Sequence, residues 1–394
     1  MKRAIYLLLI LCFSFCLYPI SYNGLSVNYI FMLFPVLVLI FHGKIPKPPQ
    51  IFLIVIFIYT IILLVASLYQ YEFYGEFSRR VISFVLFMSM FSLIFIKIDG
   101  ETITQFKYAL IVISIYFSIS SILTFVLLGG SSLGAEAKDA VGTQRFGFVY
   151  LMAFWLLLFD HKHLSIGRTF QLPAVFIVLL GLLLTFSRAS LVSLLLGICC
   201  LILFNTINWI RKPNLSTLYR ASGIVVFSIL IIIVLNIYVP IIAQFFDERL
   251  FVFFTDREML QGNLENDKGS EGIRIVIQQM IFNYVLNNPL TGSGYLGVWN
   301  ISNGFTGSAH SQYTDTLLRT GFVGFIIYLS LIIKILLHLF SKERGLFWGF
   351  LCVFFYGLFH ETFKESQGGF LLAFFIGMIS QSSLPFINKS TSHG

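Results

Sequence analysis

Long blocks of apolar residues constrain this chain more than any other feature. Blocks as long as a bilayer-spanning helix recur from the first residues almost to the C-terminal end, and they contain very few charges. A helix needs about 20 mostly apolar residues to cross the hydrocarbon core of a bilayer. In lipid every backbone N–H and C=O must find a partner inside the protein, and a helix provides all of these partners within one segment. The blocks therefore predict membrane-spanning helices.

The composition agrees with this interpretation. Only 11% of the residues are charged, and the mean hydropathy is +0.88, whereas soluble domains carry about 25% charged residues. The apolar blocks also lack the alternation that is typical of barrel strands. We predict an all-α polytopic integral membrane protein with a single membrane domain over residues 1–394. About twelve spans are expected, near 4–20, 28–42, 51–69, 81–97, 106–128, 146–160, 171–186, 189–206, 222–244, 312–338, 346–360 and 368–386.

The positions of lysine and arginine predict the orientation of the spans. Short cytoplasmic loops are enriched in these residues. A cytoplasmic N-terminus puts most of the 26 on the cytoplasmic side. With twelve spans, both termini are then cytoplasmic. The net charge of +8 follows from this distribution and does not indicate a nucleic-acid partner.

One large polar loop, residues 245–311, connects the ninth and tenth spans on the outer side. Residues 270–287 repeat apolar side chains at the spacing of one helix face, which predicts an amphipathic helix. Arg274 and Gln278 share another face, and Ser270 is a candidate N-cap. Pro289 and the glycine-rich run 292–297 are expected to end the helix. The run spells G-x-G-x-x-G, but without a surrounding strand–helix–strand unit we interpret it as a turn.

Several polar residues could carry chemistry. Arg188 lies between two apolar blocks, where a charge costs a few kcal/mol, so it either binds an anion or extends to the interface. His310 precedes the tenth span, and imidazole is the usual general base, although a lone histidine is more often structural. Arg145 and Arg274 could bind anions or simply face solvent. Neither a metal-ligand cluster nor a phosphate-binding loop is visible in the sequence.

The order of three short motifs resembles the O-antigen ligase/polymerase superfamily. The first is Thr185-x-Ser187-Arg188. The second is Arg274 followed by residues 288–294, which read N-P-L-T-G-S-G. The third is His310-Ser311, then nine residues, then G-F-V-G at 321–324. Ligases of the family continue with Thr-Gly, whereas this chain has Phe325-Ile326. This departure favours the related Wzy-type polymerase. The resemblance covers about residues 145–362.

The resemblance implies a glycosyltransferase at the outer face of the bacterial inner membrane. Family members transfer a glycan from an undecaprenyl-diphosphate carrier, and the polymerase moves the growing chain en bloc onto the next lipid-linked repeat unit. Neither a metal, a cofactor nor a nucleotide sugar is implied. Membrane lipids and the undecaprenyl-diphosphate-linked oligosaccharide are the expected partners, and a chain-length regulator protein is a candidate partner.

The same resemblance suggests roles for individual residues. Arg188 and Arg274 would stabilise the diphosphate leaving group, because guanidinium binds phosphate oxygens bidentately. His310 would activate the acceptor hydroxyl, with inversion at the anomeric carbon. Three further residues are candidates for substrate binding: Arg145, Ser187 and Glu361.

Three other functions remain open at this point. An O-antigen ligase would transfer the glycan to lipid A core. A transporter or flippase would show internal symmetry and charges near the bilayer midplane, whereas the conspicuous charges here cluster at one face. A non-catalytic membrane scaffold would leave Arg188 and His310 without a role.

Overall fold

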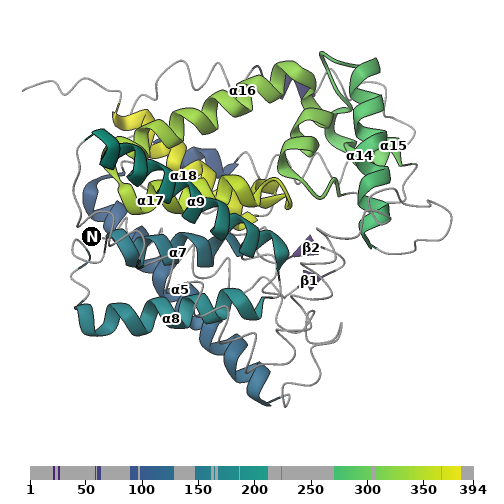
Figure 1. Ribbon diagram of the computed structural model, residues 1–394. Helices are drawn as coiled ribbons and strands as arrows, with labels where there is room; N and C mark the ends of the chain where they lie inside the picture. Colours follow the sequence, from purple (N-terminus) through teal and green to yellow (C-terminus); the bar gives the residue numbers. More distant parts are fainter. Residues whose placement is uncertain are drawn as a thin grey trace, which may run out of the picture. The chain divides into compact units, whose positions relative to one another are not determined.

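The computed structural model describes residues 21–22, 25–26, 58, 60–63, 89–95, 98–127, 147–160, 164, 167–185, 187–211, 223, 270–302, 308–364 and 366–382. Helices dominate these residues (Figure 1). Two strands of two residues each, β1 (Ser21–Tyr22) and β2 (Leu25–Ser26), pair antiparallel. The expected helical character is confirmed for the part of the chain that is described.

The helices follow the apolar blocks closely. In chain order they are η3 (Met90–Phe95), α5 (Gly100–Leu127), α7 (Gly147–Phe159), α8 (Arg168–Leu184), α9 (Arg188–Arg211), α14 (Ser270–Asn287), η6 (Gly294–Leu296), α15 (Val298–Ile301), α16 (Gln312–Lys342), α17 (Arg344–Tyr356), η7 (Thr362–Lys364) and α18 (Ser366–Ser382).

Seven of the expected spans coincide with described helices: α5, α7, α8, α9, α16, α17 and α18. Among the described helices, α5, α9 and α16 are long and apolar enough to cross a membrane, and the other four are shorter apolar helices. The expected spans 4–20 and 28–42 lie outside the described residues, as do all of 222–244 except residue 223, most of 51–69 and much of 81–97. The number of twelve spans and the side of the membrane taken by the 245–311 loop therefore stay predictions.

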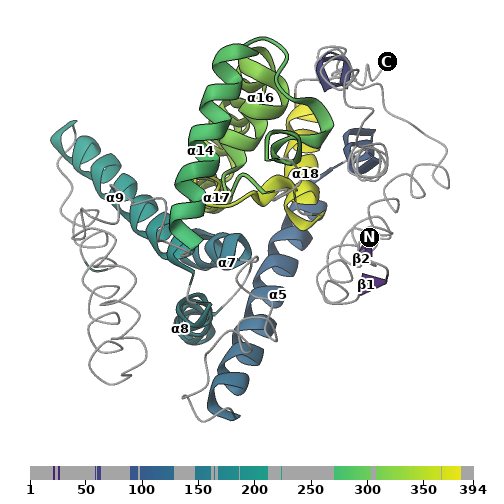
Figure 2. The same cartoon turned by 90° about the vertical axis from the view of Figure 1, so that its right-hand side faces the viewer.

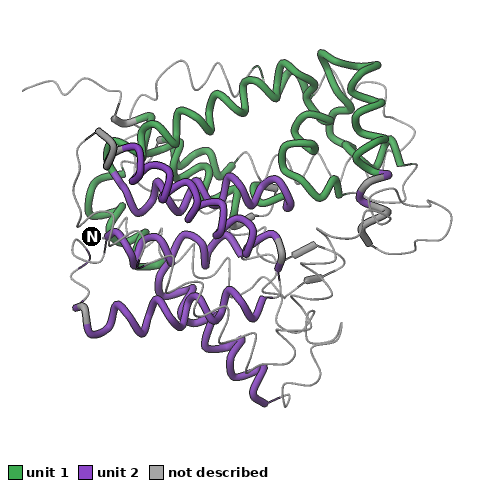
Figure 3. Tube along the Cα trace, in the orientation of Figure 1, with its two compact units in different colours: residues 1–109, 277–342, 361–394 green, residues 110–276, 343–360 purple. Residues whose placement is uncertain are grey.

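The chain divides into two compact units, shown in green and purple in Figure 3. Unit 1 contains Met1–Ala109, Ile277–Lys342 and Glu361–Gly394. Unit 2 contains Leu110–Val276 and Glu343–His360. Each unit joins segments that are far apart in the sequence. The expected single membrane domain stays a prediction.

Helix α7 forms the core of unit 2. It contacts α8, α9 and α17 (Figure 1 and Figure 2), and eleven of its thirteen residues are buried. The Trp155 ring stacks on Trp348 of α17, and its Nε1–H donates to Cys352 Sγ at 2.9 Å. Gly197 of α9 allows this approach, because a Cβ there would lie 2.2 Å from Cys352 Sγ. Unit 2 is thus held together by apolar side chains and by small residues where helices meet.

In unit 1, α16 differs from the single straight span that the sequence predicts. Gly321, with φ 62° and ψ −169°, interrupts the helix and separates residues 312–320 from residues 322–342. The reason is a close approach: a Cβ at Gly321 would lie 2.6 Å from the carbonyl of Leu290, and Phe322 N–H donates to the Pro289 carbonyl at 2.7 Å. Residues 322–342 are still long enough to cross a bilayer at 1.5 Å per residue. The expected boundary at 312 therefore marks a short polar helix that precedes the long apolar one.

Candidate active site

A glycine-rich loop follows α14 and rests on the kink of α16. Gly292, Gly294 and Gly297 all have positive φ, at 68°, 68° and 56°. The loop is fixed to α16 by backbone hydrogen bonds at both ends: Ser293 N–H donates to the Leu318 carbonyl at 2.7 Å, and Phe322 N–H donates to that of Pro289. The expected turn is confirmed, since residues 292–297 form turns and the short helix η6.

Two of these glycines are required by space as well as by φ. A Cβ at Gly292 would lie 2.3 Å from the Leu318 carbonyl oxygen, and one at Gly297 would lie 2.6 Å from the Arg319 guanidinium carbon. L-residues with a side chain rarely adopt positive φ. Gly292 and Gly321 therefore have a common structural purpose, which is to let the backbone of the loop touch the backbone of α16.

An ion pair joins the same two elements. Arg319 Nε lies 2.8 Å from Asp315 Oδ2, as the i, i+4 spacing predicts, and the two side chains are only 14% and 5% exposed. The Arg319 guanidinium also donates to the carbonyls of Gly294 and Tyr295. Tyr295 is buried in this loop, and burial raises the pKa of its hydroxyl. Arg319 therefore connects the polar half of α16 to the loop.

His310 lies in the turn that leads into α16, and its backbone is unusual. With φ 57°, it is the one non-glycine residue with positive φ among the described residues. Such a conformation costs on the order of 1–3 kcal/mol and persists only where the surroundings impose it. His310 N–H donates to Ser308 Oγ at 3.2 Å, and the side chain is half-buried.

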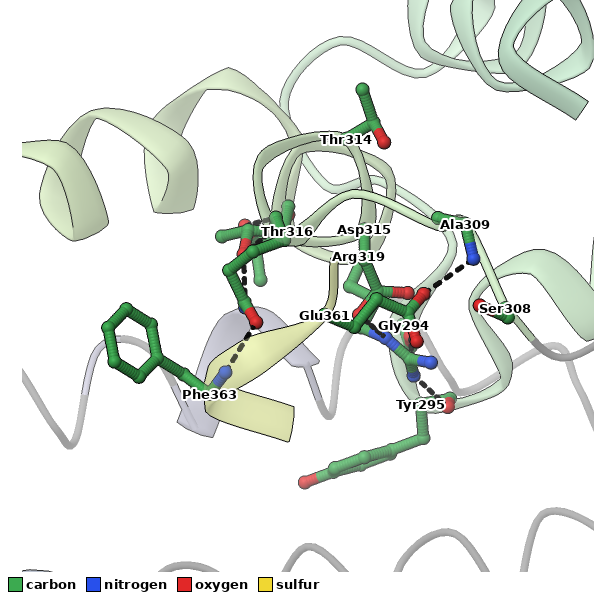
Figure 4. Close-up of polar contacts among 12 residues, drawn as sticks. Gly294, Tyr295, Ser308, Ala309, Thr314, Asp315, Thr316, Arg319, Glu361 and Phe363 are labelled. Carbon is green, nitrogen blue, oxygen red and sulfur yellow. Dashed lines mark hydrogen bonds and ion pairs between the residues drawn. The ribbon is translucent and has the colours of Figure 1, made fainter. Parts of the chain in front are cut away.

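The residue before His310 is held from two directions. Ala309 N–H donates to Glu361 Oε1 (Figure 4), and the Ala309 carbonyl accepts from Gln278 Nε2 of α14 at 2.7 Å. Phe363 N–H donates in turn to Gln312 Oε1 at 2.9 Å. Two segments distant in sequence, 309–312 and 361–363, thus exchange side-chain-to-backbone hydrogen bonds.

Helix α14 covers Ser270–Asn287, where the sequence predicts a helix, and Arg274 is exposed on it. The inward face of this helix contains Ile277, Ile281 and Val285, all buried. Arg274 lies one helical turn before Gln278, so the two residues share a face. Ser270 is the first residue of α14.

Arg188 is the first residue of α9, and Ser187 precedes it. Ser190 N–H donates to Ser187 Oγ at 3.3 Å, so Ser187 serves as the N-cap of α9. Ser187 N–H in turn donates to Thr185 Oγ1 at 3.3 Å. The Thr185-x-Ser187-Arg188 motif therefore builds a helix start. The side chain of Arg188 and the whole of Arg145 lie outside the described residues.

Five of the six predicted site residues fall into two groups, and the sixth, Arg145, lies outside the described residues. His310 and Glu361 belong to unit 1 and meet around Ala309, whereas Ser187, Arg188 and Arg274 belong to unit 2. Sequence reasoning missed the hydrogen bond from Gln278 to the Ala309 carbonyl and the one that Gln312 accepts from Phe363. Their only signals were the helical spacing from Arg274 and the position next to His310-Ser311. In the described part of the chain, no group of three or more His, Cys, Asp or Glu residues could hold a metal ion.

Comparison with known proteins bears on this site directly. Residues 173–329 match the family described as O-antigen ligase, and no match to a curated protein was found. The matched stretch contains the α9 start, α14, the glycine-rich loop, the His310 turn and the kink of α16. Residues 173–329 are therefore similar to the O-antigen ligase family, and this similarity together with the apolar helices is what a membrane protein would show.

Proposed function

We propose that this protein is a surface-polysaccharide polymerase of the Wzy type. It transfers a glycan from a lipid diphosphate carrier en bloc onto the next lipid-linked repeat unit, at the outer face of a bacterial inner membrane. The observation that carries the proposal is the His310 turn: a histidine in an imposed left-handed conformation, inside the stretch that matches the family.

The chemistry assigns one role to each residue type. His310 accepts the proton of the acceptor sugar hydroxyl as its oxygen attacks the anomeric carbon. The bond from that carbon to the diphosphate oxygen breaks, and the diphosphate leaves with the electron pair. Arg188 and Arg274 stabilise the negative charge that develops on the leaving group. Attack from the side opposite the diphosphate inverts the anomeric carbon.

The second candidate is an O-antigen ligase, which differs in its acceptor. The matching family is described as O-antigen ligase, which favours this function. The polymerase is preferred because Phe325-Ile326 follows Gly321–Gly324 where ligases have Thr-Gly. Ile326 is 61% exposed on the apolar half of α16, so a glycine there would remove an apolar side chain from this surface.

The test is glycan transfer by purified protein in detergent or nanodiscs. Synthetic lipid-diphosphate-linked repeat units are supplied alone or together with lipid A core. A ladder of products from the lipid-linked units alone supports the polymerase. Product formed only with lipid A core supports the ligase, and no product with either acceptor contradicts both.

His310→Ala and Arg274→Ala are compared with Gln279→Ala, an exposed neighbour on α14. Loss of one general base costs typically 10²–10⁴-fold in rate, so His310→Ala is expected to remove the ladder. Arg274→Ala is expected to reduce it strongly. Full activity of His310→Ala would contradict the assigned base.

A further inference from the structure

We propose that Gln278 and Glu361 are positioning residues that fix the backbone of His310 by holding the two peptide groups of Ala309. The inference rests on the proposed function, because it concerns the residue that would act as the base. It reassigns Glu361, which the sequence suggested as a substrate-binding residue, and adds Gln278 on α14.

Both residues form hydrogen bonds to the backbone next to His310. One oxygen of Glu361 accepts the Ala309 N–H, and the side chain is only 9% exposed. The Gln278 amide is directed at the Ala309 carbonyl at 2.7 Å. Each polar group thus meets the backbone of the residue next to His310, so each acts through the protein.

The hold on Ala309 fixes one side of the bond about which φ of His310 is measured. The Ala309 N–H belongs to the peptide before Ala309, and its carbonyl belongs to the peptide that links Ala309 to His310. The chain on the other side of His310 is held at the start of α16, where the Ser311 carbonyl accepts Asp315 N–H at 3.0 Å, so the two sides together impose the left-handed φ. Ser308 Oγ accepts the His310 N–H from within the same turn at 3.2 Å.

A second hydrogen bond holds the segment that contains Glu361. Gln312 Oε1 accepts Phe363 N–H at 2.9 Å, and Gln312 Nε2 lies 3.3 Å from Thr316 Oγ1. Figure 4 shows the 361–363 segment joined to the start of α16 by these contacts. The segment after α17 therefore supports the turn that contains His310 through hydrogen bonds to Ala309 and Gln312.

The experiment compares Gln278→Met, Glu361→Met and Glu361→Gln in the full-length protein, with Gln279→Met as the matched control on α14. Methionine keeps the length of the side chain and removes the hydrogen bond. Misplacement of a reacting group by about 1 Å can cost about 10²-fold, so kcat is expected to fall roughly 10–100-fold in both methionine variants. KM should stay within about twofold, because no contact with substrate is lost.

Three further results bear on the positioning role. Glu361→Gln, which keeps an acceptor oxygen, should recover most of kcat. The double variant Gln278→Met/Glu361→Met should be less impaired than the product of the single effects, because both residues hold one turn. A raised KM at unchanged kcat in Glu361→Met would overturn the proposal and return Glu361 to substrate binding.

Hydrogen exchange separates failure of this inference from failure of the proposed function. Peptides covering residues 308–311 should exchange faster in Glu361→Met than in wild type or Gln279→Met, whether or not the protein transfers glycans. Unchanged exchange there would overturn the hold on Ala309. Absence of transfer by the wild type, with faster exchange in the variant, would overturn the glycosyltransferase alone.

Discussion

The helices around α7 and the region that carries His310 are held together by different kinds of contact. In unit 2, ring stacking and apolar packing join α7 to α17, and Gly197 makes room for Cys352. In unit 1, the glycine-rich loop and the His310 turn are held mainly by hydrogen bonds to backbone groups. The first region depends on the volume of side chains, and the second depends on the course of the main chain.

This difference predicts how each region responds to substitution. A crowded side-chain contact can be relieved by shortening the opposing side chain, because cores tolerate changes that conserve total volume. A clash with a carbonyl cannot be relieved in that way. When a side chain that donates to several backbone carbonyls is removed, a neighbouring side chain cannot take over its hydrogen bonds.

The largest effect is expected for Arg319→Met. The substitution leaves the buried Asp315 carboxylate without the partner at 2.8 Å and removes the donors to the Gly294 and Tyr295 carbonyls. Breaking a buried ion pair costs about 3–5 kcal/mol. Thermal unfolding in detergent should show a large fall in melting temperature, and Lys342→Met, exposed on the same helix, should show none. Additional replacement of Asp315 by Asn should restore part of the loss, because no unpaired charge remains.

Gly292→Ala should have the next largest effect. The new Cβ would meet the Leu318 carbonyl oxygen at 2.3 Å and would require a side-chain-bearing residue at φ 68°. We expect a loss of about 1–3 kcal/mol from the backbone conformation alone, and more from the displaced loop. Gly100→Ala is the control, since nothing lies within 4 Å of its Cβ position. If the two variants had equal melting temperatures, the claim that the loop is held by close backbone contact with α16 would be contradicted.

Gly197→Ala tests the other side of the comparison. Its Cβ would lie 2.2 Å from Cys352 Sγ and 3.3 Å from the Trp155 ring. Overpacking of this kind costs about 1–3 kcal/mol. Adding Cys352→Ala should restore much of the melting temperature, because it removes the atom that clashes. If the second substitution did not restore the melting temperature, backbone positions and not side-chain volume would determine how closely α7, α9 and α17 pack.

The two regions also differ in how well the sequence predicts them, because one depends on local apolar patterns and the other on contacts between distant residues. Blocks of apolar residues predicted the ends of α5, α7, α8 and α9 to within six residues, because helix formation in lipid needs only a continuous apolar segment. The amphipathic spacing predicted α14, and Asp315 and Arg319 have the i, i+4 spacing at which ion pairs form within a helix. These signals are local in the sequence.

The contacts around His310 have no such local signal. Glu361 lies 52 residues from Ala309, and Gln278 lies 31 residues from it. Nothing in the spacing of these residues indicates a shared turn. The kink at Gly321 was also missed, since a glycine within an apolar block has no effect on hydropathy. Its cause is the contact with Leu290, which becomes visible only when the loop folds back.

The smallest effect is expected for Asp160→Ala, which tests an exception to the contrast. Asp160 is a buried polar residue in unit 2, and its Oδ1 accepts Gly345 N–H in the first turn of α17 at 3.3 Å. Glu343, which precedes α17, makes no side-chain cap, so Asp160 supplies this acceptor from the end of α7. Loss of a helix cap costs about 1 kcal/mol. Asp160→Asn, which keeps an acceptor oxygen, should lie nearer to wild type in melting temperature.

If Asp160→Ala instead lowered stability as much as Arg319→Met, polar contacts to the backbone would be as important in unit 2 as in unit 1. The two regions would then differ only in how many hydrogen bonds to the backbone each contains, and not in the kind of contact that stabilises them.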